Sequence, residues 1–167
     1  MLLWFVVLAP VIVAEVFRSP MVDYRIVAVG AVLPLAEGLF GGPNVLHTLL
    51  TAVTVLTLVM LFTQHRRLVR RRLLGVPIGL FLHLVLDATW ANQTLLWWPG
   101  FGLSFGEDQV PELQRGLVVG LVLEVIAVAV GVWAVRRYEL SDPTNRSRLI
   151  RTGQLDRQVL SRGVMER

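Results

Sequence analysis

Two histidines and two carboxylates in this sequence have the residue types and spacing of a metal site. His83 and Asp87 are four residues apart in an apolar run, so on a helix they share one face and can offer two ligands to one ion. Glu37 and His47 lie in the two preceding apolar runs. Two imidazoles and two carboxylates suit zinc or another borderline divalent ion and leave room for a bound water. The pattern therefore predicts a divalent-metal site of Glu37, His47, His83 and Asp87.

Ionisable side chains in apolar runs also have a structural interpretation. Each costs about 2.5–3.5 kcal/mol to insert into a membrane, so each needs a partner or a function. A single histidine in such a run often forms a hydrogen bond between two helices. A hydrogen-bonded network therefore stays open as the alternative to a metal site.

Five apolar runs must position these side chains. The chain has 167 residues, of which 54% are hydrophobic, and a mean hydropathy of +0.63; a spanning helix needs about 20 apolar residues. The sequence predicts an all-α integral membrane protein, with a bundle of about five transmembrane helices in residues 1–140. The predicted spans are residues 1–17, 26–40, 45–64, 73–90 and 116–135. The second is short and contains Pro34, so it either crosses the membrane or is re-entrant.

Arginines orient this bundle. Basic residues collect in cytoplasmic loops, and here five arginines lie between the third and fourth spans while Arg136 and Arg137 follow the fifth. The N-terminus is then outside and the C-terminus inside, with Trp90, Trp97 and Trp98 at the outer interface. The predicted location is the cell inner (plasma) membrane, as a multi-pass protein. The arginine-rich cytoplasmic tail over residues 141–167 is expected to be a disordered or frayed helical segment, with weak surface association with anionic lipid as the alternative.

In this topology the four candidate ligands lie at matching depth. At a rise of 1.5 Å per residue, His83 is roughly 15 Å and Asp87 roughly 21 Å from the cytoplasmic start of the fourth span. His47 and Glu37 lie near the outer ends of the third and second spans. This agreement in depth favours the metal site over the hydrogen-bonded network.

Other ionisable residues have weaker claims. Glu124 lies about 12 Å below the outer start of the fifth span and could join the site. Glu15 is expected to pair with Arg18 or Arg25 near the cytoplasmic end of the first span. His65 adjoins the arginine run and is interpreted as an interfacial residue.

The composition excludes several classes of site. With no cysteine the chain has no disulfide, thiolate metal site or cysteine nucleophile. The net charge of +4 is explained by membrane topology, so membrane lipids and no nucleic acid are the expected partners; the sequence does not fix the oligomeric state. Residues 41–44 lack the lysine of a phosphate-binding loop and are interpreted as a tight turn that delivers His47.

Four motif elements occur in a recognisable order. They are Leu33-Pro34 with Glu37, His47-Thr48-Leu49-Leu50, Gly79-x3-His83-x3-Asp87 and Leu96-Trp97-Trp98-Pro99. In this order they resemble the YdjM-like (DUF457) family of membrane-bound, metal-dependent hydrolases, over about residues 30–99. The resemblance implies that His47, His83 and Asp87 are metal ligands and that Glu37 replaces the family's second aspartate. Leu35 stands where that family has its first aspartate and Gly38 where a histidine often follows, so the motif set is reduced.

These inferences lead to one hypothesis and two alternatives. The hypothesis is a membrane-bound, metal-dependent hydrolase with an extracytoplasmic-facing site, with zinc as the expected metal and a lipid or lipid-linked molecule as the substrate. The first alternative is a non-catalytic membrane scaffold or small-solute carrier, in which the same residues form a structural network. The second is a proton or ion carrier, which needs polar residues that continue toward the cytoplasmic side, where Glu15 is one of few. Whether the chain is an enzyme stays open at this point.

Overall fold

The chain folds into a helical bundle. The computed structural model describes residues 1–39, 45–102 and 116–165, and all regular secondary structure in these ranges is helical, as predicted. The long helices are α1 (Leu2–Phe17), α2 (Tyr24–Leu39), α3 (Leu49–Phe62), α5 (Gly75–Leu86) and α8 (Leu117–Arg137). The shorter elements are η1 (Val45–His47), α4 (Arg67–Leu73), η2 (Thr89–Ala91), α6 (Gln93–Leu96), α9 (Pro143–Thr152) and α10 (Arg157–Met165).

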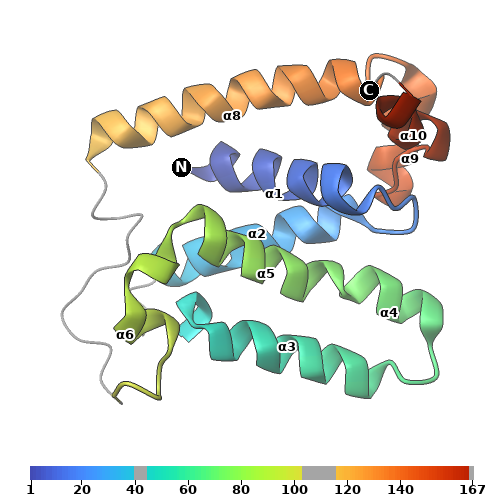
Figure 1. Cartoon of the computed structure of the whole chain (residues 1–167). Coiled ribbons are helices and arrows are strands. Elements are labelled where there is room, and N and C mark those ends of the chain that lie inside the picture. The colour runs from blue at the N-terminus through green and yellow to red at the C-terminus, as the bar shows by residue number, and fades with distance from the viewer. Residues whose placement is uncertain (40–44, 103–115, 166–167) are drawn as a thin grey trace.

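Helix α1 is central to the bundle (Figure 1). It packs against α2, α5 and α8, while α3 packs on α5. Phe5, Ala9 and Val13 recur at every fourth residue of α1, and all three are fully buried, because this spacing keeps them on one face. Helix α4 prolongs α5 and lies at the same end of the molecule as α9 and α10, whereas α6 lies at the opposite end (Figure 1).

Most helices are shorter than the predicted spans. Helix α8, with 21 residues or about 31 Å, is the one helix of the described ranges that is long and apolar enough to cross a membrane. Helices α1 and α3 are apolar but have 16 and 14 residues. The third and fourth spans were predicted too long, because Thr48 caps the start of α3 and the left-handed backbone at Ala88 (φ 55°) follows the end of α5. Helix length alone therefore supports one span and not five.

Two glycines bring α2 and α5 into backbone contact. A Cβ on Gly30 would lie 2.4 Å from the carbonyl oxygen of Val76, and a Cβ on Gly79 would lie 2.3 Å from that of Val27. Small residues are the usual means by which helix backbones approach so closely. Gly75 precedes Gly79 by one turn, so α5 presents a Gly-x3-Gly motif to α2.

The C-terminal tail is helical, as α9 and α10, but it is folded onto the bundle, so the prediction that it is disordered or frayed was wrong. The Tyr24 N–H donates to the carbonyl oxygen of Gly153 at 2.8 Å, and the Arg25 guanidinium donates to that of Ile150 at 2.6 Å. Leu155, Val159 and Leu160 of the tail are buried against the bundle. Arg137 at the end of α8 donates to the Val159 carbonyl oxygen at 3.0 Å, but Tyr24 and Arg25 are more than a hundred residues away in sequence, which is why the sequence alone did not predict the docked tail.

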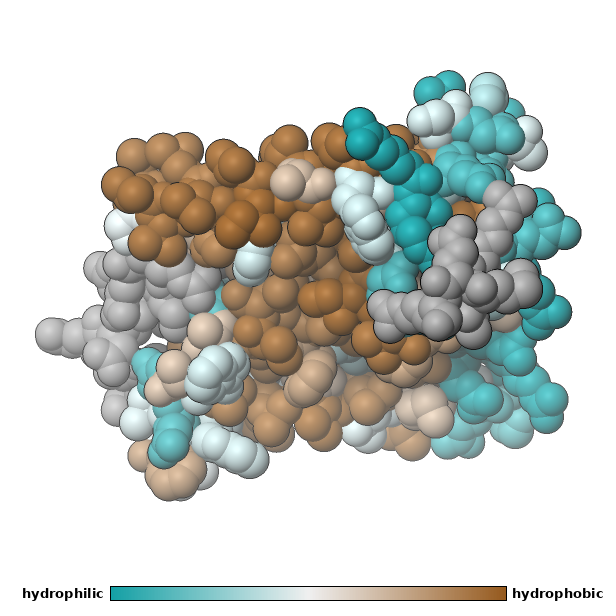
Figure 2. All heavy atoms as spheres, turned by 45° about the horizontal axis from the view of Figure 1, so that its top comes forward, coloured by the Kyte–Doolittle hydropathy of each residue, from teal (hydrophilic) through white to brown (hydrophobic). Residues whose placement is uncertain are grey.

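The lateral surface of the bundle is apolar. Large hydrophobic side chains are exposed on every long helix, for example Phe62 on α3 (82%) and Val125 on α8 (68%). Figure 2 shows a broad apolar band, with most polar residues gathered at the end that carries α9 and α10. Soluble monomers rarely expose apolar patches larger than a few hundred Å², and larger ones mark surfaces that a membrane or a protein partner covers.

We expect Gly79→Ala to destabilise the protein by about 1–3 kcal/mol, because the new methyl group must displace the backbone of α2. Thermal unfolding in detergent, followed by circular dichroism, measures this. Gly131→Ala on α8 is the matched control: its Cβ would meet the Val7 side chain at 3.7 Å, an ordinary contact, so stability should stay the same or rise slightly. Equal melting temperatures for Gly79→Ala and the wild type would contradict the close packing of α2 on α5.

Candidate metal centre

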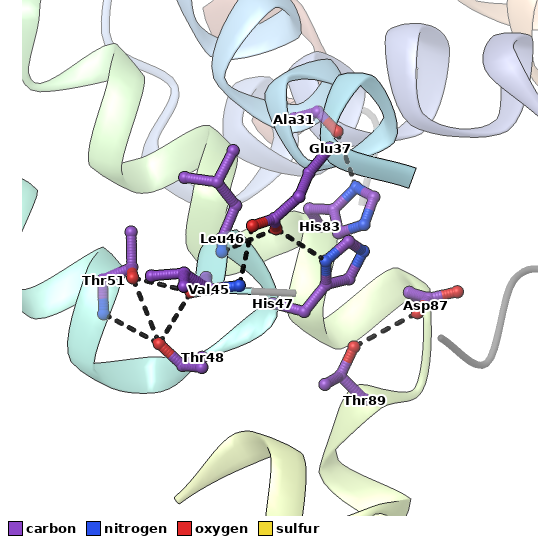
Figure 3. A network of polar contacts seen from close by, with 10 residues as sticks. All are labelled: Ala31, Glu37, Val45, Leu46, His47, Thr48, Thr51, His83, Asp87 and Thr89. Carbon is purple, nitrogen blue, oxygen red and sulfur yellow. Dashed lines mark hydrogen bonds and ion pairs between the residues drawn. The ribbon is translucent and has the colours of Figure 1, made fainter. Parts of the chain in front are cut away.

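Three of the four predicted ligands meet in the interior of the bundle (Figure 3). His47 ends η1, His83 lies in the last turn of α5, and Asp87 caps the C-terminus of α5. All three are fully buried, and one ligand atom from each lies within 4.8 Å of the others. The two imidazole rings meet edge to face, with their centroids 5.1 Å apart.

Glu37 lies behind His47 and outside this group of ligand atoms. Its carboxylate accepts hydrogen bonds from the Val45 N–H at 2.7 Å and the Leu46 N–H at 2.8 Å, which fixes the start of η1. Its Oε2 is also 3.4 Å from Nδ1 of His47. A carboxylate placed this way orients an imidazole and raises its basicity as a ligand through the other nitrogen. Glu37 was predicted as a direct ligand; in the structure its carboxylate contacts the start of η1 and the His47 ring and lies outside the group of three.

His83 is held by the backbone of α2. Its Nδ1 lies 2.7 Å from the carbonyl oxygen of Ala31; a carbonyl can only accept, so Nδ1 carries the proton. In the neutral ring the lone pair is then on Nε2, a form in which histidine binds metals. Phe5 of α1 stacks on the His83 ring with centroids 4.2 Å apart.

Asp87 is oriented by Thr89, two residues later in the chain. The Thr89 hydroxyl donates to Oδ2 of Asp87 at 3.2 Å, and Thr89 is fully buried. Sequence reasoning missed Thr89, Ala31 and Phe5 as supporting residues. A threonine two residues after a candidate aspartate is a local signal that could have been found, whereas a backbone carbonyl and a ring on another helix give no such signal.

Thr48 fixes the direction of the chain after His47. Its hydroxyl oxygen accepts the Thr51 N–H at 3.2 Å as the N-cap of α3, and the same hydroxyl donates to the Val45 carbonyl at 2.8 Å. These bonds join η1 firmly to α3, so the His47 ring is held in the interior. Residues 41–44, interpreted as the turn that delivers His47, lie outside the described residues.

Glu15 pairs at the far end of α1 with groups that were not predicted. Its carboxylate accepts a hydrogen bond from the Tyr138 hydroxyl at 3.0 Å and lies 3.6 Å from Nε of Arg137. The predicted pairing of this carboxylate with Arg18 or Arg25 was therefore wrong. Burial, reinforced by the nearby Glu15 carboxylate, raises the pKa of Tyr138, so the phenol stays protonated and donates.

The other ionisable residues also lie away from the centre. Glu124 is 3.3 Å from the amino group of Met1 and does not join the ligand group. His65 is exposed. Trp90 and Trp97 are 62% and 52% exposed; these two tryptophans belong to η2 and the C-cap of α6, at the end of the molecule opposite α4.

The donor set fits a divalent metal ion. Two imidazoles and one carboxylate from the protein, with a position left for water or substrate, are typical of catalytic zinc sites. A four-coordinate zinc with bonds of about 2.0–2.1 Å separates its ligands by about 3.4 Å, so a modest contraction of the 4.8 Å group would suffice. His47, His83 and Asp87 could thus hold a metal ion, with Glu37, Ala31 and Thr89 orienting them.

Comparison with known proteins finds no match: no family model, no curated protein and no solved structure matches this chain. Fold and site define an all-helical protein with a buried His-His-Asp group able to hold a metal ion. The resemblance to the YdjM-like family rests on the motif residues alone.

We expect Glu37→Gln to weaken divalent-metal affinity about 10–100-fold. In the wild type the Val45 and Leu46 N–H groups donate to the two carboxylate oxygens of Glu37, whereas a glutamine amide has one acceptor oxygen for both. Competition with a chromophoric chelator in detergent measures the Kd. Glu15→Gln removes a carboxylate at the far end of α1 and should leave the affinity unchanged. An unaltered Kd in Glu37→Gln would contradict the orienting role, and a protein that takes up no metal even at saturation would identify Glu37 as a ligand.

Proposed function

We propose that this chain is a multi-pass membrane protein that binds one divalent metal ion at His47, His83 and Asp87 and hydrolyses a lipid or lipid-linked substrate there. The observation that carries the proposal is the convergence of these three fully buried side chains inside an apolar bundle. Two imidazoles and one carboxylate in one group are a donor set that divalent ions bind. Zinc is the ion that this donor set suits best.

The residues around the centre prepare it for this chemistry. Glu37 and the Ala31 carbonyl set the rotation of the two imidazoles, and Thr89 sets that of the Asp87 carboxylate. Phe5 covers one face of His83 and excludes water from it. When bound, a divalent ion supplies a water of lowered pKa, the nucleophile that hydrolysis requires.

The apolar lateral band, with most polar residues gathered at the end that carries α9 and α10, supports placement in a membrane (Figure 2). The described helices of 12 to 16 residues extend about 18–24 Å, less than the roughly 30 Å hydrocarbon core. Short apolar helices are accommodated by local thinning of the bilayer and by snorkelling of flanking side chains. A multi-pass protein of the cell inner membrane is the proposal that follows.

The arginine end of the molecule gives the orientation. Helix α4 and the end of α8, with Arg136 and Arg137, lie at the end opposite α6 (Figure 1). Because basic ends face the cytoplasm, the metal group then lies in the extracytoplasmic half. Lipids of the outer leaflet can reach that half, which is the reason for proposing a lipid or lipid-linked substrate.

Membership of the YdjM-like family is part of this proposal. It is supported by the placement of His47, His83 and Asp87 in one group. Leu35 and Gly38 stand at positions where that family carries further ligand-type residues, so we propose a single metal ion for this chain. The alternative, a non-catalytic scaffold, would use the same hydrogen bonds to Ala31 and Thr89 to join helices.

Metal content separates the two functions. We expect about one equivalent of zinc in the detergent-purified wild type, and loss of it in His83→Ala and Asp87→Asn, measured by inductively coupled plasma mass spectrometry. Asp87→Asn keeps the size of the side chain and an acceptor for Thr89, so it should fold normally. His65→Ala, which removes an exposed histidine, is the control and should keep its metal. Folded wild-type protein that binds no added zinc would overturn the proposal in favour of the scaffold.

Membrane orientation can be tested by cysteine labelling, because the chain has no cysteine of its own. We expect Trp97→Cys to react with a membrane-impermeant maleimide in intact spheroplasts. His65→Cys, also at an exposed position, should react only after the membrane is opened. Labelling of both sites from the same side, or recovery of the chain outside the membrane fraction, would contradict the topology.

A further inference from the structure

Five arginines at the end opposite the metal centre have no ion pair with a carboxylate among the described residues. They lie on or beside α4 and are Arg66, Arg67, Arg70, Arg71 and Arg72. The arginines that do form ion pairs there are Arg25, Arg137 and Arg148. Like charges four residues apart on a helix repel each other, so a bound anion would stabilise this segment.

Two of these arginines border a hollow. Arg71 and Arg72 line a cavity of about 230 Å³, together with Met21 from the turn between α1 and α2 and Gln154 from the tail. A second hollow of about 270 Å³ shares Arg71 and Met21 with the first and adds Ser19. Three separate segments of the chain therefore form a concave site around the guanidinium groups.

This basic hollow continues into an apolar groove. The second hollow shares Ile78 with a groove of about 430 Å³ that runs between α1, α3 and α5. Only apolar side chains line the groove, among them Phe17, Val53, Pro77 and Phe81. A cationic mouth and an apolar groove in series match a molecule that carries a phosphate at one end and a hydrocarbon chain at the other.

We propose that this site binds one anionic phospholipid, with its phosphate at Arg71 and Arg72 and an acyl chain along the groove. Basic pockets beside membrane helices on the cytoplasmic side bind anionic headgroups, and guanidinium groups pair with phosphate oxygens through two parallel hydrogen bonds. A free phosphate ion would leave the apolar groove unused, which is why a lipid is the occupant. The inference rests on the membrane placement proposed above.

The arginine half of the site is tested by matched double variants. Purified full-length protein is titrated with phosphatidylglycerol or phosphatidylcholine of identical acyl chains, and bound lipid is measured by native mass spectrometry. We expect phosphatidylglycerol to bind more tightly, and Arg71→Gln with Arg72→Gln to weaken it about 10-fold or more. Arg66→Gln with Arg67→Gln makes the same change in charge outside the hollow and should have little effect. Equal weakening by both pairs, or equal affinity for the two lipids, would overturn the site.

The groove is tested by filling it with a larger side chain. Val53→Trp should reduce phosphatidylglycerol binding. The control is Val128→Trp on α8, which lies outside the groove and has a similar exposure (52% against 50% for Val53); it should leave phosphatidylglycerol binding unchanged. Displacement of the lipid by millimolar inorganic phosphate, with no effect of Val53→Trp, would assign the hollow to free phosphate and overturn the lipid site. Metal content measured on the same samples distinguishes failure of the lipid site from failure of the proposed metal-dependent function. A metal-binding membrane protein without preference for phosphatidylglycerol refutes this inference alone, and a chain outside the membrane refutes the proposed function.

Discussion

The backbone contact between α2 and α5 is the constraint on which the rest of the structure depends. Gly75, Gly79, His83 and Asp87 follow one another at four-residue intervals along one ridge of α5. The glycines remove the Cβ atoms that would hold α2 away. His83 of α5 can then form its 2.7 Å hydrogen bond to the Ala31 carbonyl of α2, and Asp87 follows at the end of the ridge. The geometry of the candidate metal centre is therefore a consequence of helix packing.

Helix α2 also sets the orientation of both histidines. His83 is held through Nδ1 by the Ala31 carbonyl, and His47 is held through Nδ1 by Glu37, six residues further along α2. One bond to each ring already suffices to join α2 to α5 and η1. Ligand atoms from His47, His83 and Asp87 also come within 4.8 Å of one another. This convergence is the observation on which the proposed metal site rests.

Sequence reasoning predicted what depends on local periodicity and missed what depends on packing. A helix turns the four-residue spacing of His83 and Asp87 into a common direction, so this part of the site could be predicted. The place of Glu37 depends on backbone N–H groups of η1, which have no side-chain signature. Hydropathy located the apolar segments but not their ends, because the Thr48 cap and the left-handed Ala88 shorten the helices within apolar sequence. The docking of the tail was missed because Tyr24 and Arg25, which hold it, are distant from it in sequence.

Helix α5 connects the two ends of the molecule. Its first residue, Gly75, lines the second, 270 Å³ hollow beside Arg71, and its C-cap, Asp87, belongs to the candidate metal centre. Between them Gly79 locks the helix against α2, which fixes its position along the bundle axis. A shift of α5 along its axis would change the hollow and would also move His83 relative to the Ala31 carbonyl. Close glycine packing makes such a shift costly, because a tightly packed helix pair resists small displacements. It therefore fixes the two proposed sites relative to each other.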